Sequence, residues 1–152
     1  MEQPQYNLLH REKMEKEYLK LFKDYKMGTT IWSPLASGVL SGKYNNGIPK
    51  GSRLALGDYK WLLDRYKAME WKERAKKLAK LADKLGVSMA QMSIAWVLKN
   101  KNVSTVITGA SKVEQLTQNM KSLEVVKMLD AGVMDEIENI LKNKPEAVEV
   151  FR

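Results

Sequence analysis

The sequence predicts an α/β fold of three parallel strands connected by helices. Segments 2–9, 29–32 and 103–108 are β-prone, and between them lie stretches with the three- and four-residue apolar spacing of amphipathic helices. Strands separated by helices pair in parallel through right-handed crossovers. The chain has 152 residues, whereas a closed (β/α)8 barrel takes about 250. We therefore expect a single domain that cannot close such a barrel alone.

The N-terminal third is expected to contain the first two strands and a helix between them. A strand over residues 2–9 ends where a charged periodic stretch begins. Apolar spacing over residues 12–25 predicts a helix, and Gly28 is suited to end it. A second strand over residues 29–32 should stop at Pro34, which cannot donate a ladder hydrogen bond. The buried face of the helix should consist of Met14, Tyr18, Leu21, Phe22 and Tyr25.

The middle of the chain is expected to be a long loop followed by helices. Residues 33–59 are dense in Gly, Pro, Asn and Ser. Unstructured connections of this length are usually functional or disordered, and we expect this one to be functional. Helical spacing resumes over residues 61–86 with one break. Ser88 and Gln91 then form the Ser-x-x-Gln pattern of a capping box for a further helix.

The C-terminal part should supply the third strand and two helices. The β-branched run over residues 103–108 predicts a buried strand. Ser111 and Glu114 have the spacing of a second capping box, so this strand leads directly into a helix N-terminus. A last helix is expected over residues 130–141, and residues 145–152 should form a loose tail. The inward side chains of the last helix should be Val133, Ile137, Ile140 and Leu141.

The composition excludes several classes of protein. The chain has no cysteine and one histidine, His10, which leaves no disulfide framework and too few ligands for a transition-metal site. No apolar stretch approaches the roughly 20 residues of a membrane-spanning helix, and the N-terminus lacks the pattern of a signal peptide. We expect a cytoplasmic protein that is neither secreted nor inserted in a membrane, in which His10 is structural.

The net charge of +8 favours an anionic partner without naming one. Much of the excess lies between Lys60 and Lys84, where basic side chains are interleaved with leucines as in an amphipathic helix. A solvated helix face, a surface for a partner protein and a nucleic-acid surface all fit this pattern. Charge alone supports the last of these, so we expect no nucleic-acid binding.

Three features are candidates for ligand binding. Gly109 and Ser111 join a strand to a helix N-terminus, which is either an anion site or an ordinary turn. Lys43 and Arg53 in the long loop either bind the same anion or are simply exposed to solvent. Trp32, at the end of a strand, either presents its ring to a planar ligand or packs in the core.

Several long motifs, in the same order along the chain, carry a family resemblance. They are residues 3–9 (QPQYNLL), 32–38 (WSPLASG), 41–44 (SGKY) and 106–111 (VITGAS). The chain resembles an aldo-keto reductase over nearly its whole length. Residues 47–53 (GIPKGSR) and 58–62 (DYKWL) favour the branch that contains the voltage-gated potassium channel beta subunits and their plant and microbial relatives.

The resemblance implies an incomplete (β/α)8 TIM barrel made of the last three parallel strands and their helices. The family's catalytic Asp, Tyr, Lys and His lie on earlier strands, and no residue here aligns with them. Tyr6 and Lys43 are not substitutes, so we expect no catalytic residue in this chain. In the complete barrel, the family reduces carbonyl compounds with hydride from NADPH.

The resemblance also implies most of an NADP site, covered by the long loop over residues 33–59. Gln3 meets the nicotinamide carboxamide, and Trp32 stacks on the nicotinamide ring. The segment after Trp32 lines the pyrophosphate, and two cations of the loop reach the phosphates. The residues implied here are Gln3, Trp32, Ser33, Pro34, Leu35, Ala36, Ser37, Lys43 and Arg53.

The last strand and its helix complete the implied NADP site. Gly109 belongs to this part of the site. After it, Ser111 and Gln115 hold the ribose that carries the 2′-phosphate, and Gln118 and Asn119 face the adenine. Relatives carry Glu at the position of Gln118, an exchange that keeps an acceptor for the adenine amino group.

A half-barrel also needs a partner to cover its open side. We expect either a complementary N-terminal half-barrel or self-association. The alternative function is a non-catalytic interaction module, like the potassium channel beta subunits, that associates with a channel-like membrane complex.

Overall fold

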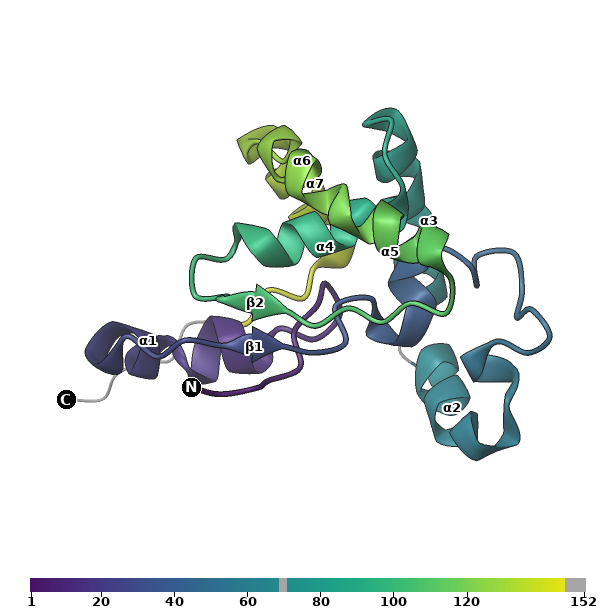
Figure 1. Cartoon of the computed structure of the whole chain (residues 1–152), viewed down its shortest axis with the longest axis horizontal. Coiled ribbons are helices and arrows are strands. Elements are labelled where there is room, and N and C mark those ends of the chain that lie inside the picture. The colour runs from purple at the N-terminus through teal and green to yellow at the C-terminus, as the bar shows by residue number, and fades with distance from the viewer. Residues whose placement is uncertain (69–70, 147–152) are drawn as a thin grey trace.

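The computed structural model describes residues 1–68 and 71–146. It contains two short strands, seven α-helices and several shorter helical turns (Figure 1). The strands are β1 (Thr30–Ile31) and β2 (Thr105–Val106). The helices are α1 (Leu19–Tyr25), α2 (Lys60–Ala68), α3 (Trp71–Lys84), α4 (Met89–Lys99), α5 (Val113–Met120), α6 (Ser122–Val125) and α7 (Ala131–Leu141).

The sheet confirms the prediction of an α/β fold with parallel pairing. Thr30 of β1 lies opposite Thr105 of β2, and Ile31 lies opposite Val106. The two strands run side by side in Figure 1. On the other side of β1, the N-terminal segment adds two isolated parallel bridges, from Glu2 to Thr29 and from Gln5 to Trp32.

The first predicted strand is shorter and less regular than expected. Its parallel contacts with β1 end at Gln5, and the chain reverses between Asn7 and His10, which form an antiparallel bridge. The backbone therefore turns before Leu9 instead of continuing to it. The amide of Asn7 stabilises this turn, because its Oδ1 accepts from the N–H of Leu9 at 2.9 Å.

The predicted helix over residues 12–25 is divided in two. A π-helical turn, Lys13–Glu17, precedes α1, and the N–H of Tyr18 donates to the carbonyl of Lys13 at 2.9 Å. A π turn adds one residue to the helical repeat and so rotates the following side chains. Met14 and Phe22 are buried as expected, but Tyr25 is 76% exposed. The prediction that Tyr25 is buried was wrong.

The same helix ends at Tyr25, the last residue of the predicted range, but Gly28 is not the residue that ends it. Lys26 takes the left-handed conformation at φ 53°, two residues before Gly28. The N–H of Lys26 donates to the carbonyl of Phe22, which completes the last turn. The chain then runs directly into Thr29, which begins the pairing with the N-terminal segment.

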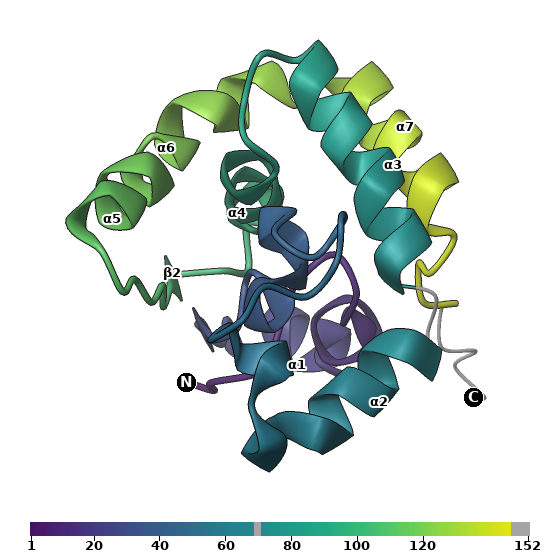
Figure 2. The ribbon, with the colours of Figure 1, turned by 90° about the vertical axis from the view of Figure 1, so that its right-hand side faces the viewer.

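Helix α4 lies at the centre of the fold. It packs against α3, α6 and the 3-10 turn Ala36–Ser41, and Figure 2 shows it surrounded by these elements. The predicted capping box at its start is confirmed. The N–H of Gln91 donates to Ser88 Oγ at 3.1 Å, and the N–H of Ser88 donates to Gln91 Oε1 at 2.9 Å.

The third predicted strand is exposed, whereas the sequence predicted a buried one. Thr105 is exposed, and Ile107 is 43% exposed. β2 is the edge of the sheet within the described residues, because its only partner is β1. A β-branched run that a neighbouring strand would normally cover is therefore open to solvent.

Helices α2, α3 and α7 follow the prediction closely, whereas α6 was not predicted. Two helices, α2 and α3, occupy the range where one interrupted helical stretch was expected. The carboxylate of Asp130 caps α7, accepting from the N–H of Val133 at 2.9 Å. Of the predicted inward residues, Ile137 and Leu141 are buried, and Val133 and Ile140 are partly buried.

The long loop and the tail complete the fold. The loop over residues 33–59 contains the short 3-10 turns Ala36–Ser41, Arg53–Ala55 and Gly57–Tyr59 and is therefore more structured than predicted. Residues 145 and 146 of the predicted tail have no regular structure, and residues 147–152 lie outside the described residues.

Candidate functional site

The candidate site begins at the carboxyl end of the sheet. The N–H of Ile107 donates to the carbonyl of Ile31 at 2.8 Å, which keeps β1 and β2 in register to their ends. The loops that follow Trp32 and Thr108 consequently leave the sheet at the same end, the carboxyl end of the strands. In parallel sheets, ligands bind at this end. The structure thus places the predicted segments after Trp32 and around Gly109 next to the same end of the sheet.

The loop after Trp32 has an unusual backbone. Ser33, Ala36 and Ser37 have φ values of 56°, 47° and 57°, and Gly38 has a φ of 94°. Left-handed conformations cost residues other than glycine about 1 kcal/mol or more each, and they concentrate at functional sites. Asn7 holds the loop in place, because its Nδ2 donates to the carbonyl of Ser33 at 2.9 Å.

Within residues 35–38 of this loop, two N–H groups have no partner in the protein. Among the described residues, the N–H groups of Leu35 and Ser37 donate to no other protein atom. Their neighbours are satisfied, since the N–H of Ala36 donates to Ser33 and that of Gly38 to Leu35. Unpaired N–H groups in a loop that mixes right- and left-handed residues form a concave site for anions.

Lys43 lies across this same loop. A Cβ atom added to Gly38 would come within 2.6 Å of Lys43 Nζ, so the end of the lysine side chain lies directly against Gly38. The ammonium also lies 5.0 Å from the centre of the Tyr44 ring. Lys43 is exposed, and its ammonium group lies next to the loop that has the unpaired N–H groups. This placement suits the predicted phosphate contact.

Trp32 and Gln3 are both accessible. Trp32 is 45% exposed, so it is not packed in the core, and its role towards a planar ligand stays a prediction. Gln3 is exposed on the N-terminal segment, between the two bridges that pair this segment with β1. Pro34 and Ala36 of the same loop, by contrast, are buried.

The segment around Ser111 differs from the prediction. Lys112 is extended, with φ −143°, so α5 starts at Val113 and has no side-chain cap. Instead, the N–H and Oγ of Ser111 both lie within hydrogen-bond distance of Gln115 Oε1, at 2.9 and 3.2 Å. The predicted capping box with Glu114 does not form. The structure nevertheless brings Ser111 and Gln115 together on an exposed surface.

The predicted adenine contacts are partly occupied by other protein groups. Gln91 Nε2 donates to Gln118 Oε1 at 2.9 Å and to the carbonyl of Gln118 at 3.2 Å. One acceptor site of the Gln118 amide is therefore used inside the protein. Asn119 is buried, with 9% of its surface exposed.

Arg53 is not joined to the Ser111 segment. Its guanidinium lies 5.7 Å from the centre of the Tyr59 ring and is exposed. Among the described residues it forms no hydrogen bond or ion pair with the segment from Ser111 to Asn119. In Figure 2, α5 stands apart from the chain that leads into α2.

A pocket that the sequence did not predict lies beside Trp32. Its volume is about 160 Å³, and it is bounded by the N-terminal segment, the loop after Trp32, α2 and the start of α3. The spacing of Trp61 and Arg65, four residues apart on one helix, is the sequence signal that could have indicated it. The lining residues are Gln5, Asn7, His10, Trp32, Ala36, Ser37, Trp61, Leu62, Arg65 and Trp71.

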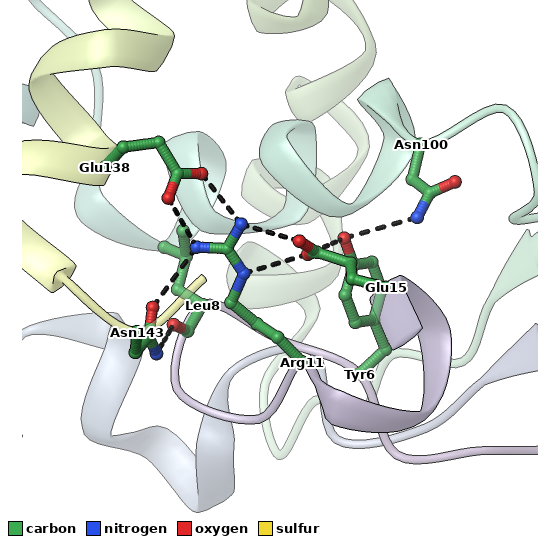
Figure 3. Close-up of polar contacts among 7 residues, drawn as sticks. All are labelled: Tyr6, Leu8, Arg11, Glu15, Asn100, Glu138 and Asn143. Carbon is green, nitrogen blue, oxygen red and sulfur yellow. Dashed lines mark hydrogen bonds and ion pairs between the residues drawn. The ribbon is translucent and has the colours of Figure 1, made fainter. Parts of the chain in front are cut away.

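Sequence reasoning also missed a buried ion cluster around Arg11, shown in Figure 3. The guanidinium of Arg11 contacts the carboxylates of both Glu15 and Glu138. Tyr6 belongs to this cluster, because its hydroxyl donates to Glu15 Oε1 at 2.7 Å. Burial, and secondarily Glu15, raises the pKa of Tyr6 well above its usual range. Tyr6 is therefore a structural residue, not a proton donor for a ligand.

The described residues contain neither a metal-binding cluster nor a membrane-spanning helix. No group of three or more His, Cys, Asp or Glu side chains there is arranged to hold a metal ion. In the same residues, no helix has the length and apolar character needed to cross a membrane.

Comparisons with known proteins agree with the sequence resemblance. The model of the Aldo/keto reductase family matches residues 1–142. A rice protein (Oryza sativa subsp. japonica) named "Probable voltage-gated potassium channel subunit beta" is 48% identical over 153 residues, covering 100% of this chain and 47% of the relative. A protein of the same name from Arabidopsis thaliana is 46% identical, with the same coverage. The chain spans about half the length of these curated relatives.

Proposed function

Because the chain belongs to the aldo/keto reductase family, we propose that it is the NADP(H)-binding C-terminal half of a carbonyl-reducing (β/α)8 barrel. The observation that carries this proposal is the loop after Trp32. This loop offers two unpaired N–H groups and the Lys43 ammonium at the carboxyl end of the sheet. The pyrophosphate of a dinucleotide has the charge and the acceptor atoms that such a loop can bind.

Each part of the dinucleotide has a proposed contact. Trp32 provides a flat surface for the nicotinamide ring, and Gln3 lies on the neighbouring segment for its carboxamide. Leu35, Ser37 and Lys43 bind the pyrophosphate. Ser111 and Gln115 exchange the hydrogen bonds between them for hydrogen bonds to the 2′-phosphate. When bound, the nicotinamide supplies the hydride that reduces a carbonyl carbon.

The proposed function needs a second half of the barrel. By the family resemblance, the residues that would protonate the carbonyl oxygen have no counterpart in this chain, and β2 is an open edge among the described residues. Apolar side chains on α5 and α6 are exposed at helical spacing, namely Val113, Leu116, Met120 and Leu123. These features support a complementary N-terminal half, or a second copy of the chain, as the group that covers this side.

Cofactor fluorescence tests the proposed function directly. NADPH titrated into the chain should show enhanced and blue-shifted emission, and Trp32→Ala and Lys43→Gln should each weaken binding about tenfold. Lys72→Gln removes an exposed charge on α3 and serves as the matched control. Absence of binding by the unmodified chain, or equal affinity in all three variants, would contradict the proposal.

A second candidate function follows from the names of the relatives. Two proteins that resemble the chain are named as probable voltage-gated potassium channel subunits beta. A non-catalytic module that associates with a channel-like complex would use the exposed apolar surface of α5 and α6 and would not need NADPH. Co-purification with a full-length homologue, undisturbed by Lys43→Gln, would favour this alternative.

A further inference from the structure

The pocket beside Trp32 contains polar side chains that have no partner inside the protein. Among the described residues, Gln5, His10 and Arg65 form no side-chain hydrogen bond and no ion pair, although each lines the pocket. Asn7 also lines it, but both ends of its amide are already used, on Leu9 and Ser33. The pocket therefore offers a guanidinium, an imidazole and one free amide to an incoming molecule.

The other walls of the pocket are aromatic. Trp32 and Trp61 are 45% and 61% exposed, and Trp71 is buried with its ring centre 5.3 Å from the Arg65 guanidinium. Stacking on Trp71 holds that guanidinium at the pocket wall. The volume of about 160 Å³ is close to the roughly 150 Å³ of a cavity that accommodates benzene. The space suits one aromatic ring with a small substituent.

We propose that this pocket binds a single-ring aromatic carboxylate, with the carboxylate on Arg65 and the ring against Trp32 and Trp61. A guanidinium binds a carboxylate through two parallel hydrogen bonds, and an indole provides a favourable stacking surface. Trp32 is also the proposed surface for the nicotinamide ring, so the carboxylate and NADP(H) should compete for it. Binding of the carboxylate itself goes beyond the proposed function and requires no dinucleotide.

His10 links this binding to pH. Burial, followed by the positive charges of Arg65 on α2 and Lys13 on the N-terminal turn, lowers the pKa of His10, while Glu12 and Glu17 of that turn act in the opposite direction. A bound carboxylate offsets the repulsion from Arg65, so His10 takes up a proton when the ligand binds. The affinity should therefore increase as the pH falls from about 7.5 to about 5.5.

Fluorine NMR of 4-fluorobenzoate provides the test, in the full 152-residue chain and without NADP(H). The carboxylate of this probe, with a pKa of about 4, stays ionised over the pH range used. We expect 4-fluorobenzoate to bind at least tenfold more tightly than the neutral 4-fluorobenzamide. Arg65→Gln should abolish that difference, and His10→Gln should remove the pH dependence but retain binding.

Two further variants keep the result interpretable. Lys67→Gln removes an exposed charge two residues away on α2 and should leave the affinity unchanged. Arg65→Lys keeps the charge but not the two parallel hydrogen bonds, and it should retain part of the preference for the carboxylate. Equal binding of acid and amide, or an Arg65→Gln variant that folds and binds normally, would overturn the proposal. Because no dinucleotide is present, either result leaves the NADP(H) proposal standing.

Discussion

Arg11 and Glu138 form a double ion pair between the two ends of the described chain. Arg11 Nη1 lies 2.7 Å from Glu138 Oε2, and Arg11 Nη2 lies 2.8 Å from Glu138 Oε1, across a sequence separation of 127 residues. The Arg11 side chain is 3% exposed and that of Glu138 is 28% exposed. Asn143 adds a second link, because its Nδ2 donates to the carbonyl of Leu8 at 2.9 Å. The cluster therefore fixes α7 against the N-terminal segment that begins the site.

Arg11→Met should strongly destabilise the fold. Removing the guanidinium leaves the carboxylates of Glu15 and Glu138 close together without their shared cation. Breaking a buried ion pair in this way costs about 3 kcal/mol or more of unfolding free energy, which urea denaturation at neutral pH can measure.

An exposed pair supplies the control for that measurement. Lys20 pairs with Asp24 on α1, and its side chain is 84% exposed. Exposed pairs contribute about 0–1 kcal/mol, so Lys20→Gln should barely change the urea midpoint. If Arg11→Met were equally mild, the Arg11 cluster would not hold the two ends of the chain together.

The single histidine predicts a pH dependence of stability. Burial and the charges of Arg65 and Lys13 lower the pKa of His10 below its ordinary value of 6.5. The unfolded chain therefore binds a proton at higher pH than the folded one. Stability contributed by neutral His10 is complete above about pH 6.5 and is lost as the pH falls through the lower, folded pKa. Urea midpoints measured from about pH 7.5 to 5.5 should decline in the unmodified chain and stay flatter in His10→Gln. A parallel decline in both would assign the effect to other groups.

Local signals in the sequence predicted the elements that depend on neighbours in the chain. The Ser88–Gln91 capping box forms as expected because it requires only residues within one helical turn. The burial of the strand over residues 103–108 could not be predicted in the same way, since it depends on a further strand that the described chain does not place beside β2.

The same distinction between local and long-range contacts applies to the candidate site. The loop after Trp32 and the exposed Trp32 were predicted from a motif, whereas the pocket was not. Its lining includes both Gln5 and Trp71, two residues far apart in the sequence, and no local pattern encodes that arrangement. Arg11 was missed for the same reason, although Glu15 four residues later was a usable signal.

The chain alone should not reduce aldehydes. Carbonyl reduction requires an acid to protonate the oxygen, and acid assistance and electrostatic stabilisation each contribute at least about 100-fold. Tyr6 cannot take that role, because its hydroxyl is buried and donates to Glu15. Tag-free protein incubated with 4-nitrobenzaldehyde and NADPH should show no steady oxidation of the cofactor. Turnover that disappears on mutation of this chain would prove the expectation wrong.

Self-association should follow from the exposed side of α5. Leu116 is 50% exposed and Met120 is 58% exposed, on the helix that follows the open edge of β2. We expect the isolated chain to be oligomeric or prone to aggregation in light scattering. The double variant Leu116→Lys, Met120→Lys should shift it towards the monomer, while Thr117→Lys on the same exposed helix should not. A stable 17.4 kDa monomer of the unmodified chain would show that this side is covered in another way.

Cofactor preference gives the sharpest test of the proposed dinucleotide site. In the complete barrel, NADPH should bind more tightly than NADH, because the 2′-phosphate adds about two negative charges that Arg53 and Ser111 can meet with hydrogen bonds. A charge-assisted hydrogen bond contributes about 1.5–3 kcal/mol, so Arg53→Ala should weaken NADPH binding tenfold or more. Ser111→Ala should have a smaller effect, since the Ser111 hydroxyl already has Gln115 as a partner in the free protein.

NADH separates the possible roles of Arg53. This cofactor lacks the 2′-phosphate, so its affinity should fall little in Arg53→Ala if the guanidinium contacts that phosphate alone. The structure shows no contact of Arg53 with the Ser111 segment and places its guanidinium over Tyr59 instead. Equal losses for NADPH and NADH would therefore assign Arg53 to the pyrophosphate, beside Lys43 and the loop after Trp32. Titration of both cofactors against the unmodified protein and the two variants decides between these assignments, and an unchanged affinity in both variants would refute the 2′-phosphate site.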